Sequence, residues 1–264
     1  MIKIATLVKK TSMPLVIHSD LALPGATQPF LRKVSLDLHQ GDAMYDGNDR
    51  HYLSCGASAL NVILSALRLA DRPDPAAILD FGSGAGRVTR WLRAAFPLAV
   101  LDVCDLREDD VRFCRDTFQA RTWVSGTLIG DLNAPDAYDL IWLGSVATHL
   151  SSEATERLLL KMLSWTRPCG LVVMSLHGRY AFQRQETREF CYIDDDRWQR
   201  IKAGYETAGF GYSDYDGQKG YGISLTRPSW IAALIERLPG ARITALSERA
   251  WDGHHDVVAI QSLK

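Results

Sequence analysis

The sequence lacks long apolar runs, a large net charge and paired cysteines, and each absence argues against certain classes of protein. None of its 264 residues belong to an uninterrupted run of about 20 apolar residues, and the apolar stretch between Lys3 and Lys9 is too short for a signal peptide. The formal net charge of −1 gives no general attraction to nucleic acid or anionic lipid. The cysteines are few, odd in number and form no C-x-x-C pair: Cys55, Cys104, Cys114, Cys169 and Cys191. We therefore expect a cytoplasmic protein with free thiols and with neither a membrane nor a nucleic-acid partner.

What the sequence does contain is a regular alternation of strand-like and helix-like segments from residue 77 onward. This alternation predicts an α/β fold with a parallel sheet covered by helices. Helices are expected at about 87–96, 108–118, 151–167, 194–208 and 229–238, and strands at 77–80, 99–104, 121–125, 138–143, 171–176, 241–247 and 256–263. Only about eight residues separate the last two strands, so the final strand is predicted to run antiparallel.

Two segments lie outside this alternation. In residues 1–76 only a helix at 52–70 is predicted, and we expect the segment to act as a lid or substrate-binding region. Residues 178–227 interrupt the alternation after the fifth strand. They hold ten of the 24 aromatic residues, which favours an aromatic cap for a ring-bearing or sugar substrate, although a cap also needs an apolar core or a dimer interface. The sequence does not decide whether the protein forms a homodimer through these aromatic residues.

A glycine-rich turn follows the first predicted strand. Gly82, Gly84 and Gly86 alternate with other residues between Asp80 and a helix. Glycines allow a ligand to approach the backbone, and free amides at a helix start favour polar ligand groups. Arg87 stands where a dinucleotide-binding motif needs its third glycine, so the spacing favours S-adenosylmethionine and disfavours an NAD-dependent oxidoreductase.

A second signal is Asp105, 19 residues after Gly86 at the end of the second predicted strand. Nucleoside-binding α/β folds place a carboxylate there to bind the ribose hydroxyls, and the same residue can also cap the following helix.

The sequence 80–86, Asp105, the strand 138–142 and the turn 167–170 together resemble class I S-adenosylmethionine-dependent methyltransferases. The resemblance implies a Rossmann-like seven-stranded sheet of order 3-2-1-4-5-7-6 with the last strand antiparallel. It also implies a methyltransferase core at 77–264, with 178–227 inserted as the cap. The cofactor implied is S-adenosylmethionine. Its expected contacts are Asp80, Gly82, Ser83, Gly84, Gly86, Asp105, Leu106, Gly126, Thr127, Asp131, Gly144 and Ser145, with Gly126, Thr127 and Asp131 as competing candidates for the adenine.

Histidines follow three of the strands that should end at the ligand-binding edge. His149 and His177 are candidate general bases that would take a proton from an acceptor hydroxyl. Each could equally have a structural role. Candidate substrate contacts are Tyr52, Tyr221, Trp251, His254 and His255. We expect no metal site, because the histidines lack a ligand spacing such as H-x-x-x-H.

The leading hypothesis is methyl transfer to a small molecule or glycan, at a hydroxyl. The alternatives are an N-methyltransferase acting on a protein or nucleic-acid amine and a non-catalytic S-adenosylmethionine-binding protein. The first alternative is disfavoured because Leu143-Gly144-Ser145-Val146 lacks the N/D-P-P-Y/F motif typical of those enzymes.

Overall fold

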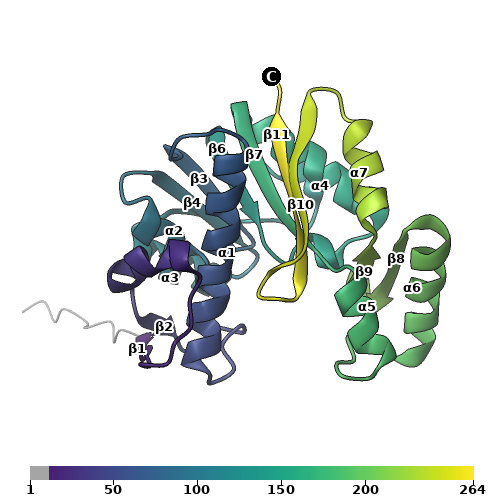
Figure 1. The fold of residues 1–264 in the computed structure, drawn as a ribbon, viewed down its shortest axis with the longest axis horizontal. Helices are drawn as coiled ribbons and strands as arrows, with labels where there is room; N and C mark the ends of the chain where they lie inside the picture. Colours follow the sequence, from purple (N-terminus) through teal and green to yellow (C-terminus); the bar gives the residue numbers. More distant parts are fainter. Residues whose placement is uncertain (1–11) are drawn as a thin grey trace, which may run out of the picture.

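A seven-stranded mixed sheet forms the centre of the molecule in the computed structural model, which describes residues 12–264 (Figure 1). Its strands are β3 (Ala77–Phe81), β4 (Val100–Asp105), β5 (Arg121–Val124), β6 (Tyr138–Leu143), β7 (Thr166–Leu176), β10 (Ala241–Trp251) and β11 (His255–Ser262). The order is β10-β11-β7-β6-β3-β4-β5, and β11 runs antiparallel to both of its neighbours. The expected strand order and the reversed last strand are confirmed.

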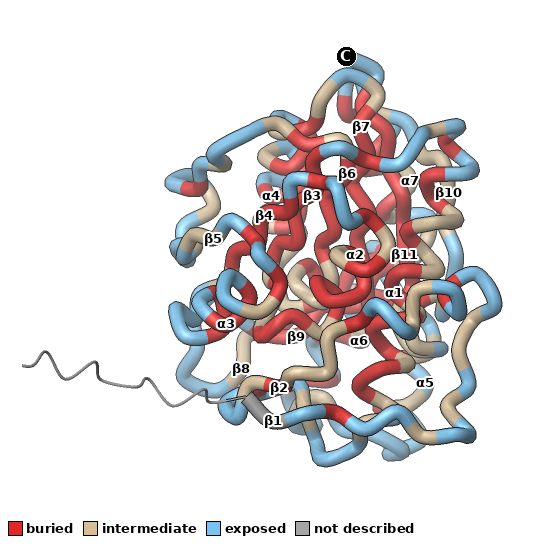
Figure 2. Tube along the Cα trace, turned by 90° about the vertical axis from the view of Figure 1, so that its left-hand side faces the viewer, coloured by how far each residue is buried: buried red, intermediate tan, exposed pale blue. Residues whose placement is uncertain are grey.

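Helices cover both faces of this sheet. They are α1 (Asp49–Leu69), α2 (Thr89–Ala95) and α3 (Glu108–Phe118) on one face, and α4 (Ser152–Trp165) and α7 (Pro228–Glu236) on the other. Successive strand residues point to opposite faces: Ile78 packs with the first group of helices and Leu79 with the second. The central strands are therefore mostly apolar and buried, as the red tube in Figure 2 shows.

The N-terminal segment packs beside α1 and α2. It contains β1 (Ser12–Pro14), the 3₁₀ helix η1 (Gly25–Lys33) and β2 (Asp37–His39), with β1 and β2 antiparallel. The predicted helix at 52–70 begins earlier, at Asp49, because the side chain of Asn48 accepts a hydrogen bond from the amide of His51. The proposed absence of a signal peptide concerns residues outside the described part of the chain.

The cap consists of α5 (Arg179–Glu186), α6 (Asp195–Ala208), β8 (Phe210–Tyr215) and β9 (Gln218–Thr226). As predicted, Asp194 caps α6 and Gly209 ends it in a left-handed conformation. The β8–β9 hairpin was not predicted. The cap has its own apolar cluster, in which Trp198, Ile201 and Tyr205 are buried.

The short 3₁₀ helices η2 (Ile129–Asp131) and η3 (Ala147–His149) lie in the loops after β5 and β6. The fifth predicted strand begins at Thr166 instead of Leu171. Cys169 adopts a positive φ of 61° within β7, so the expected turn is an irregularity inside a strand. All five cysteines are free thiols. Helix α1 has the length and composition of a membrane span, but its apolar side chains are largely buried in the fold.

Candidate active site

The glycine turn lies at the carboxyl edge of the sheet, directly after β3. The amides of Gly82 and Ser83 donate to the carbonyl of Cys104, at 2.9 and 3.1 Å. Gly84 has a positive φ of 51°, and a Cβ built on it would meet no atom within 4 Å. Gly84 therefore presents bare backbone to open space, which is what an approaching ligand requires.

The other two glycines of the turn face protein atoms. A Cβ on Gly82 would lie 2.5 Å from Cγ2 of Val146, and one on Gly86 would collide with the ring of Phe118 on α3. Their lack of a side chain lets the turn pack closely against neighbouring elements.

Asp105 connects this turn to the end of β4. Its Oδ2 accepts the amide of Gly84 at 2.9 Å, and its Oδ1 accepts the amide of Arg107 at 3.1 Å. Each carboxylate oxygen keeps acceptor capacity for a ligand hydroxyl. Leu106, next in the chain, is 56% exposed and offers an apolar surface beside the carboxylate.

Asp80 lies beneath the turn and is almost completely buried. Thr89 Oγ1 donates to its Oδ2 at 2.6 Å. Burial, opposed in part by this hydrogen bond, raises the pKa of Asp80 to about 7. Ser83, also buried, points its hydroxyl at the carbonyl of Gly84.

The remaining expected cofactor contacts lie in the loops after β5 and β6. Gly126, Thr127 and Asp131 are all exposed, and the structure does not choose among them for the adenine. Ser145 has a positive φ of 59° and donates its amide to Ser175 Oγ at 2.7 Å.

Gly144, before Ser145, lacks the Cβ that would approach Trp142 Nε1 to 2.6 Å. The loop after β6 is thus held close to its own strand and to β7.

His149, at the end of η3, contacts the cap hairpin. Its Nδ1 lies 2.8 Å from the carbonyl oxygen of Gly222, and its ring stacks on Tyr221 with centroids 4.8 Å apart. The ring centroid of Tyr215 lies 6.0 Å from that of His149 and 5.4 Å from that of Tyr221. Burial lowers the pKa of His149 below the ordinary histidine value. Burial, and secondarily the charge of Asp105, raises the pKa of Tyr221 above the ordinary tyrosine value.

Three more histidines meet nearby. His177 follows β7, His255 begins β11, and His254 lies in the turn between β10 and β11. The ring centroid of His177 is 4.9 Å from that of His255 and 5.5 Å from that of His254. Burial lowers the pKa of His177 to about 3 and that of His254 to about 4. The expectation that distant segments bring their histidines to one rim thus agrees with the geometry.

Tyr52 and Trp251 have neighbours that explain their burial without a substrate. Tyr52 donates its hydroxyl to Asp42, and Trp251 Nε1 donates to the carbonyl of Cys55 at 3.0 Å. Each is at most 3% exposed. Their placement indicates packing of the N-terminal segment and α1 against the sheet, and it gives no support to direct substrate contacts.

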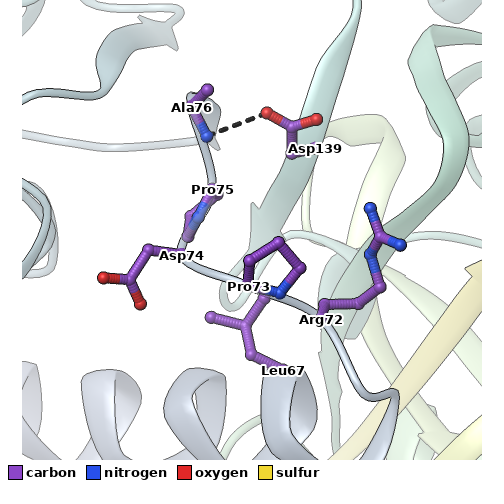
Figure 3. A pocket seen from close by; sticks show the side chains of 7 residues that line it. All are labelled: Leu67, Arg72, Pro73, Asp74, Pro75, Ala76 and Asp139. Carbon is purple, nitrogen blue, oxygen red and sulfur yellow. Dashed lines mark hydrogen bonds between the residues drawn. The ribbon is translucent and has the colours of Figure 1, made fainter.

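A small hollow lies at the amino ends of the strands, away from the glycine turn and the histidines (Figure 3). Asp139 accepts the amides of Ala76 and Ala77 there, both at 2.9 Å, and pairs with Arg167 at 3.1 Å. These bonds fix the starting ends of β3, β6 and β7.

Sequence reasoning did not single out Tyr192, Tyr215 or Arg184 as site residues, although all three lie against the histidines. Tyr192 Oη is 3.0 Å from His254 Nε2, and Arg184 Nη1 is 3.1 Å from His254 Nδ1. The aromatic density of the insertion was the available signal. It could not separate these tyrosines from those, such as Tyr205, that form the cap's own core.

A family model described as a methyltransferase domain matches residues 78–170, which span β3 to the start of β7 and include Asp105. Residues 78–170 form a methyltransferase domain of the class I S-adenosylmethionine-dependent kind. The match covers Gly84, Asp105 and the loop after β6, and these features fit S-adenosylmethionine.

Known methyltransferases resemble the chain over most of its length. A malonyl-[acyl-carrier protein] O-methyltransferase of Halalkalibacterium halodurans is 25% identical over 198 residues, which cover 66% of this chain and 72% of that protein. A Burkholderia thailandensis 1,6-didemethyltoxoflavin-N1-methyltransferase superposes with a TM-score of 0.56 at 14% identity, covering 96% and 95% of the two chains. An S-adenosylmethionine-dependent methyltransferase of Clostridium acetobutylicum gives a TM-score of 0.54 at 11% identity, covering 78% and 91%. At these identities, the structural matches establish the fold of the methyltransferase.

Proposed function

We propose that this methyltransferase transfers the methyl group of S-adenosylmethionine to a hydroxyl of a small molecule or glycan, with His149 as the general base. The acceptor would lie between the carboxyl edge of the sheet and the β8–β9 hairpin. The cap and the N-terminal segment flank this edge in Figure 1.

The hydrogen bond at His149 Nδ1 carries the proposal. A carbonyl oxygen can only accept, so the 2.8 Å contact with Gly222 places the ring proton on Nδ1. Nε2 then bears the lone pair and can accept a proton from a hydroxyl. His177 is less suited to this role, because complete burial lowers its pKa to about 3.

The cofactor-binding residues would act by position. When bound, S-adenosylmethionine supplies an electrophilic methyl group on a sulfonium. The bare backbone of Gly84 would admit the cofactor, Asp105 would accept hydrogen bonds from its ribose, and Leu106 would contact its adenine. Tyr221 stacks on the ring of His149, so it would shield the proposed base from water.

The names of the relatives support a small acceptor but differ in the atom methylated. The Halalkalibacterium protein is an O-methyltransferase acting on a malonyl group attached to its carrier, and the Burkholderia enzyme is an N1-methyltransferase with a small heterocycle bound. The argument for a hydroxyl therefore depends on His149.

Calorimetry with S-adenosylmethionine tests the cofactor site. Gly84→Val should fill the open space and weaken binding at least tenfold, and Asp105→Ala should do the same by removing the ribose acceptor. Gly240→Val is the matched control, because Gly240 also has a positive φ (75°) and no atom within 4 Å of its Cβ, but lies before β10 at the opposite edge. Equal affinity in Gly84→Val and Gly240→Val would contradict the assignment.

Turnover of His149→Gln tests the base. Release of S-adenosylhomocysteine is measured with phenols, aliphatic alcohols and free sugars, with amines in parallel. The substitution should lower turnover of a hydroxyl acceptor by about 10²- to 10⁴-fold while cofactor affinity stays unchanged. His18→Gln, whose ring is half-exposed beside Asp49, is the control.

Two outcomes would reject the proposal. Turnover with amines but with none of the hydroxyl acceptors would identify an N-methyltransferase. Tight cofactor binding with no turnover of any acceptor would favour a non-catalytic binding protein.

A further inference from the structure

Three histidines from two chain segments converge beside the proposed acceptor space. In the antiparallel pairing of β11 with β7, Asp256 lies opposite Leu176, so His255 lies opposite His177. The turn before β11, closed by a hydrogen bond from the amide of His254 to the carbonyl of Trp251, brings His254 to the same place. One ring nitrogen of each histidine lies within 4.8 Å of the others.

Two of these rings contain buried nitrogens without a partner. Nδ1 of His177 and Nδ1 of His255 are inaccessible to solvent and make no hydrogen bond with any residue in 12–264. A buried polar atom left unpaired costs about 1–3 kcal/mol. Two such atoms on facing rings indicate that the cluster is built to receive something that the protein chain itself does not supply.

We propose that His177, His254 and His255 bind one divalent transition-metal ion of the Zn²⁺ type. Imidazole nitrogens suit Zn²⁺, Co²⁺ and Ni²⁺, whereas Mg²⁺ and Ca²⁺ require oxygen ligands, of which this trio has none. Three histidines with a fourth position open are a known arrangement for zinc.

The observed spacing allows this coordination after a small contraction. Zn–N bonds of about 2.0 Å in a tetrahedral site place the nitrogens about 3.3 Å apart. The rings must therefore approach by about 1.5 Å or less from their present separations. Rotation of the side chains, that of His254 above all since it sits in a turn, can supply this movement.

Arg184 competes with the metal. Its Nη1 lies 3.1 Å from Nδ1 of His254, and the charges of Arg184 and Arg249 both act on this ring. Arg184 also pairs with Glu189 at 3.1 Å, so it keeps a partner if it leaves the histidine. With Nδ1 released, the Nε2–H of His254 can still donate to Tyr192 Oη, a contact of the kind that orients metal-bound histidines.

A role of the metal in binding the acceptor rests on the proposed function, because it requires that this edge of the sheet bind an acceptor. The open position of the metal would bind an oxygen of the acceptor, which favours acceptors with an oxygen donor next to the methylated hydroxyl. Binding of the metal itself requires neither cofactor nor acceptor.

The untagged chain, stripped with a chelator, is titrated with Co²⁺ alone and followed by calorimetry and visible absorption. We expect one equivalent to bind, with the d–d bands of a four-coordinate site. His254→Gln and His255→Asn should each weaken this binding at least about 100-fold, whereas His18→Gln should leave it unchanged. Arg184→Met keeps all three ligands but removes the competing charge, so it should tighten Co²⁺ binding several-fold.

The proposal would be overturned if the natural chain bound no Co²⁺, or bound it no more tightly than the His254→Gln/His255→Asn double variant. Weaker binding in Arg184→Met would overturn it as well. Retained affinity for S-adenosylmethionine shows that each variant is folded. Since the titration contains no acceptor, its failure would leave the proposed methyl transfer intact, and loss of methyl transfer would leave the metal site intact.

Discussion

At the residue scale, Asp80 is the most deeply buried acid among the expected cofactor contacts. It is almost fully buried, and its pKa is raised from 3.8 to about 7. Between these two pH values the folded chain holds a proton that the unfolded chain has released. The folded state therefore loses stability as the pH rises through this window.

Asp80→Asn should remove this dependence, because an amide does not titrate and can still accept the hydrogen bond from Thr89. The difference in unfolding free energy, variant minus natural chain, should grow by about 1.4 kcal/mol per pH unit between pH 4 and 7, reaching on the order of 4 kcal/mol. Urea unfolding at several pH values measures it. A difference that does not change with pH would show that Asp80 is already ionised in the folded protein.

The glycine turn shows what a motif predicts at this scale and what it leaves out. Its spacing, together with Asp105, correctly indicated the class of enzyme. It could not reveal that Gly84 faces open space while Gly86 admits the ring of Phe118, because that distinction depends on how α3 packs on the turn.

At the element scale, the residues that begin and end helix α6 were predictable from the sequence, and the β8–β9 hairpin was not. Asp194 and Gly209 are local signals that bound α6. The hairpin has the glycine-rich composition of a loop, yet two of its glycines serve close packing. A Cβ on Gly211 would collide with the carbonyl of Ile201 in α6, and one on Gly222 with the carbonyl of Ser213. Only the three-dimensional contact explains these glycines.

Gly211→Ala should therefore push β8 away from α6 and loosen the cap. We expect faster amide exchange across residues 178–227, and at least a tenfold loss of turnover because His149 depends on the carbonyl of Gly222 in the same hairpin. The affinity for S-adenosylmethionine should change little. Hydrogen exchange measured by mass spectrometry follows the cap directly.

Gly217→Asn is the control for this change. Gly217 lies in the hairpin turn with φ of 69° and no atom within 4 Å of its Cβ, and asparagine tolerates that conformation. Unchanged exchange in Gly211→Ala would mean that α6 and β8 adjust without loosening the cap.

At the scale of the whole molecule, the sheet order was predictable because the family resemblance implied it, whereas the alternation of elements predicted only a parallel sheet covered by helices. The metal site that we propose at the histidine cluster was not predicted from the sequence. Rules of ligand spacing detect pairs within one helix or loop, whereas His177 and His255 meet through the register of two strands. Spacing along the chain contains no information about such a register.

The attachment of the N-terminal segment also depends on contacts between distant residues. Arg90 on α2 is buried, and its Nη1 donates to the carbonyls of Ser35 and Asp37 at 2.7 and 2.9 Å. Its Nε donates to the carbonyl of Gly86 at 3.1 Å. The guanidinium of Arg90 therefore joins the N-terminal segment to the glycine turn, so the positions of these two parts depend on each other.

Arg90→Met should detach the N-terminal segment from the glycine turn. The carbonyls of Ser35 and Asp37 lose their donors, so unfolding free energy should fall by about 2–4 kcal/mol, and limited proteolysis should cut residues 33–48 at least tenfold faster. Arg93→Met is the matched control, because Arg93 lies on the same helix but donates to the carbonyls of Phe118 and Ala99, which are outside the N-terminal segment. If both variants are cut at the same rate, the segment is held by its apolar contacts with α1, and Arg90 only stabilises the turn. Faster cutting in Arg90→Met together with weaker binding of S-adenosylmethionine would show that the N-terminal segment and the cofactor turn form one cooperative unit.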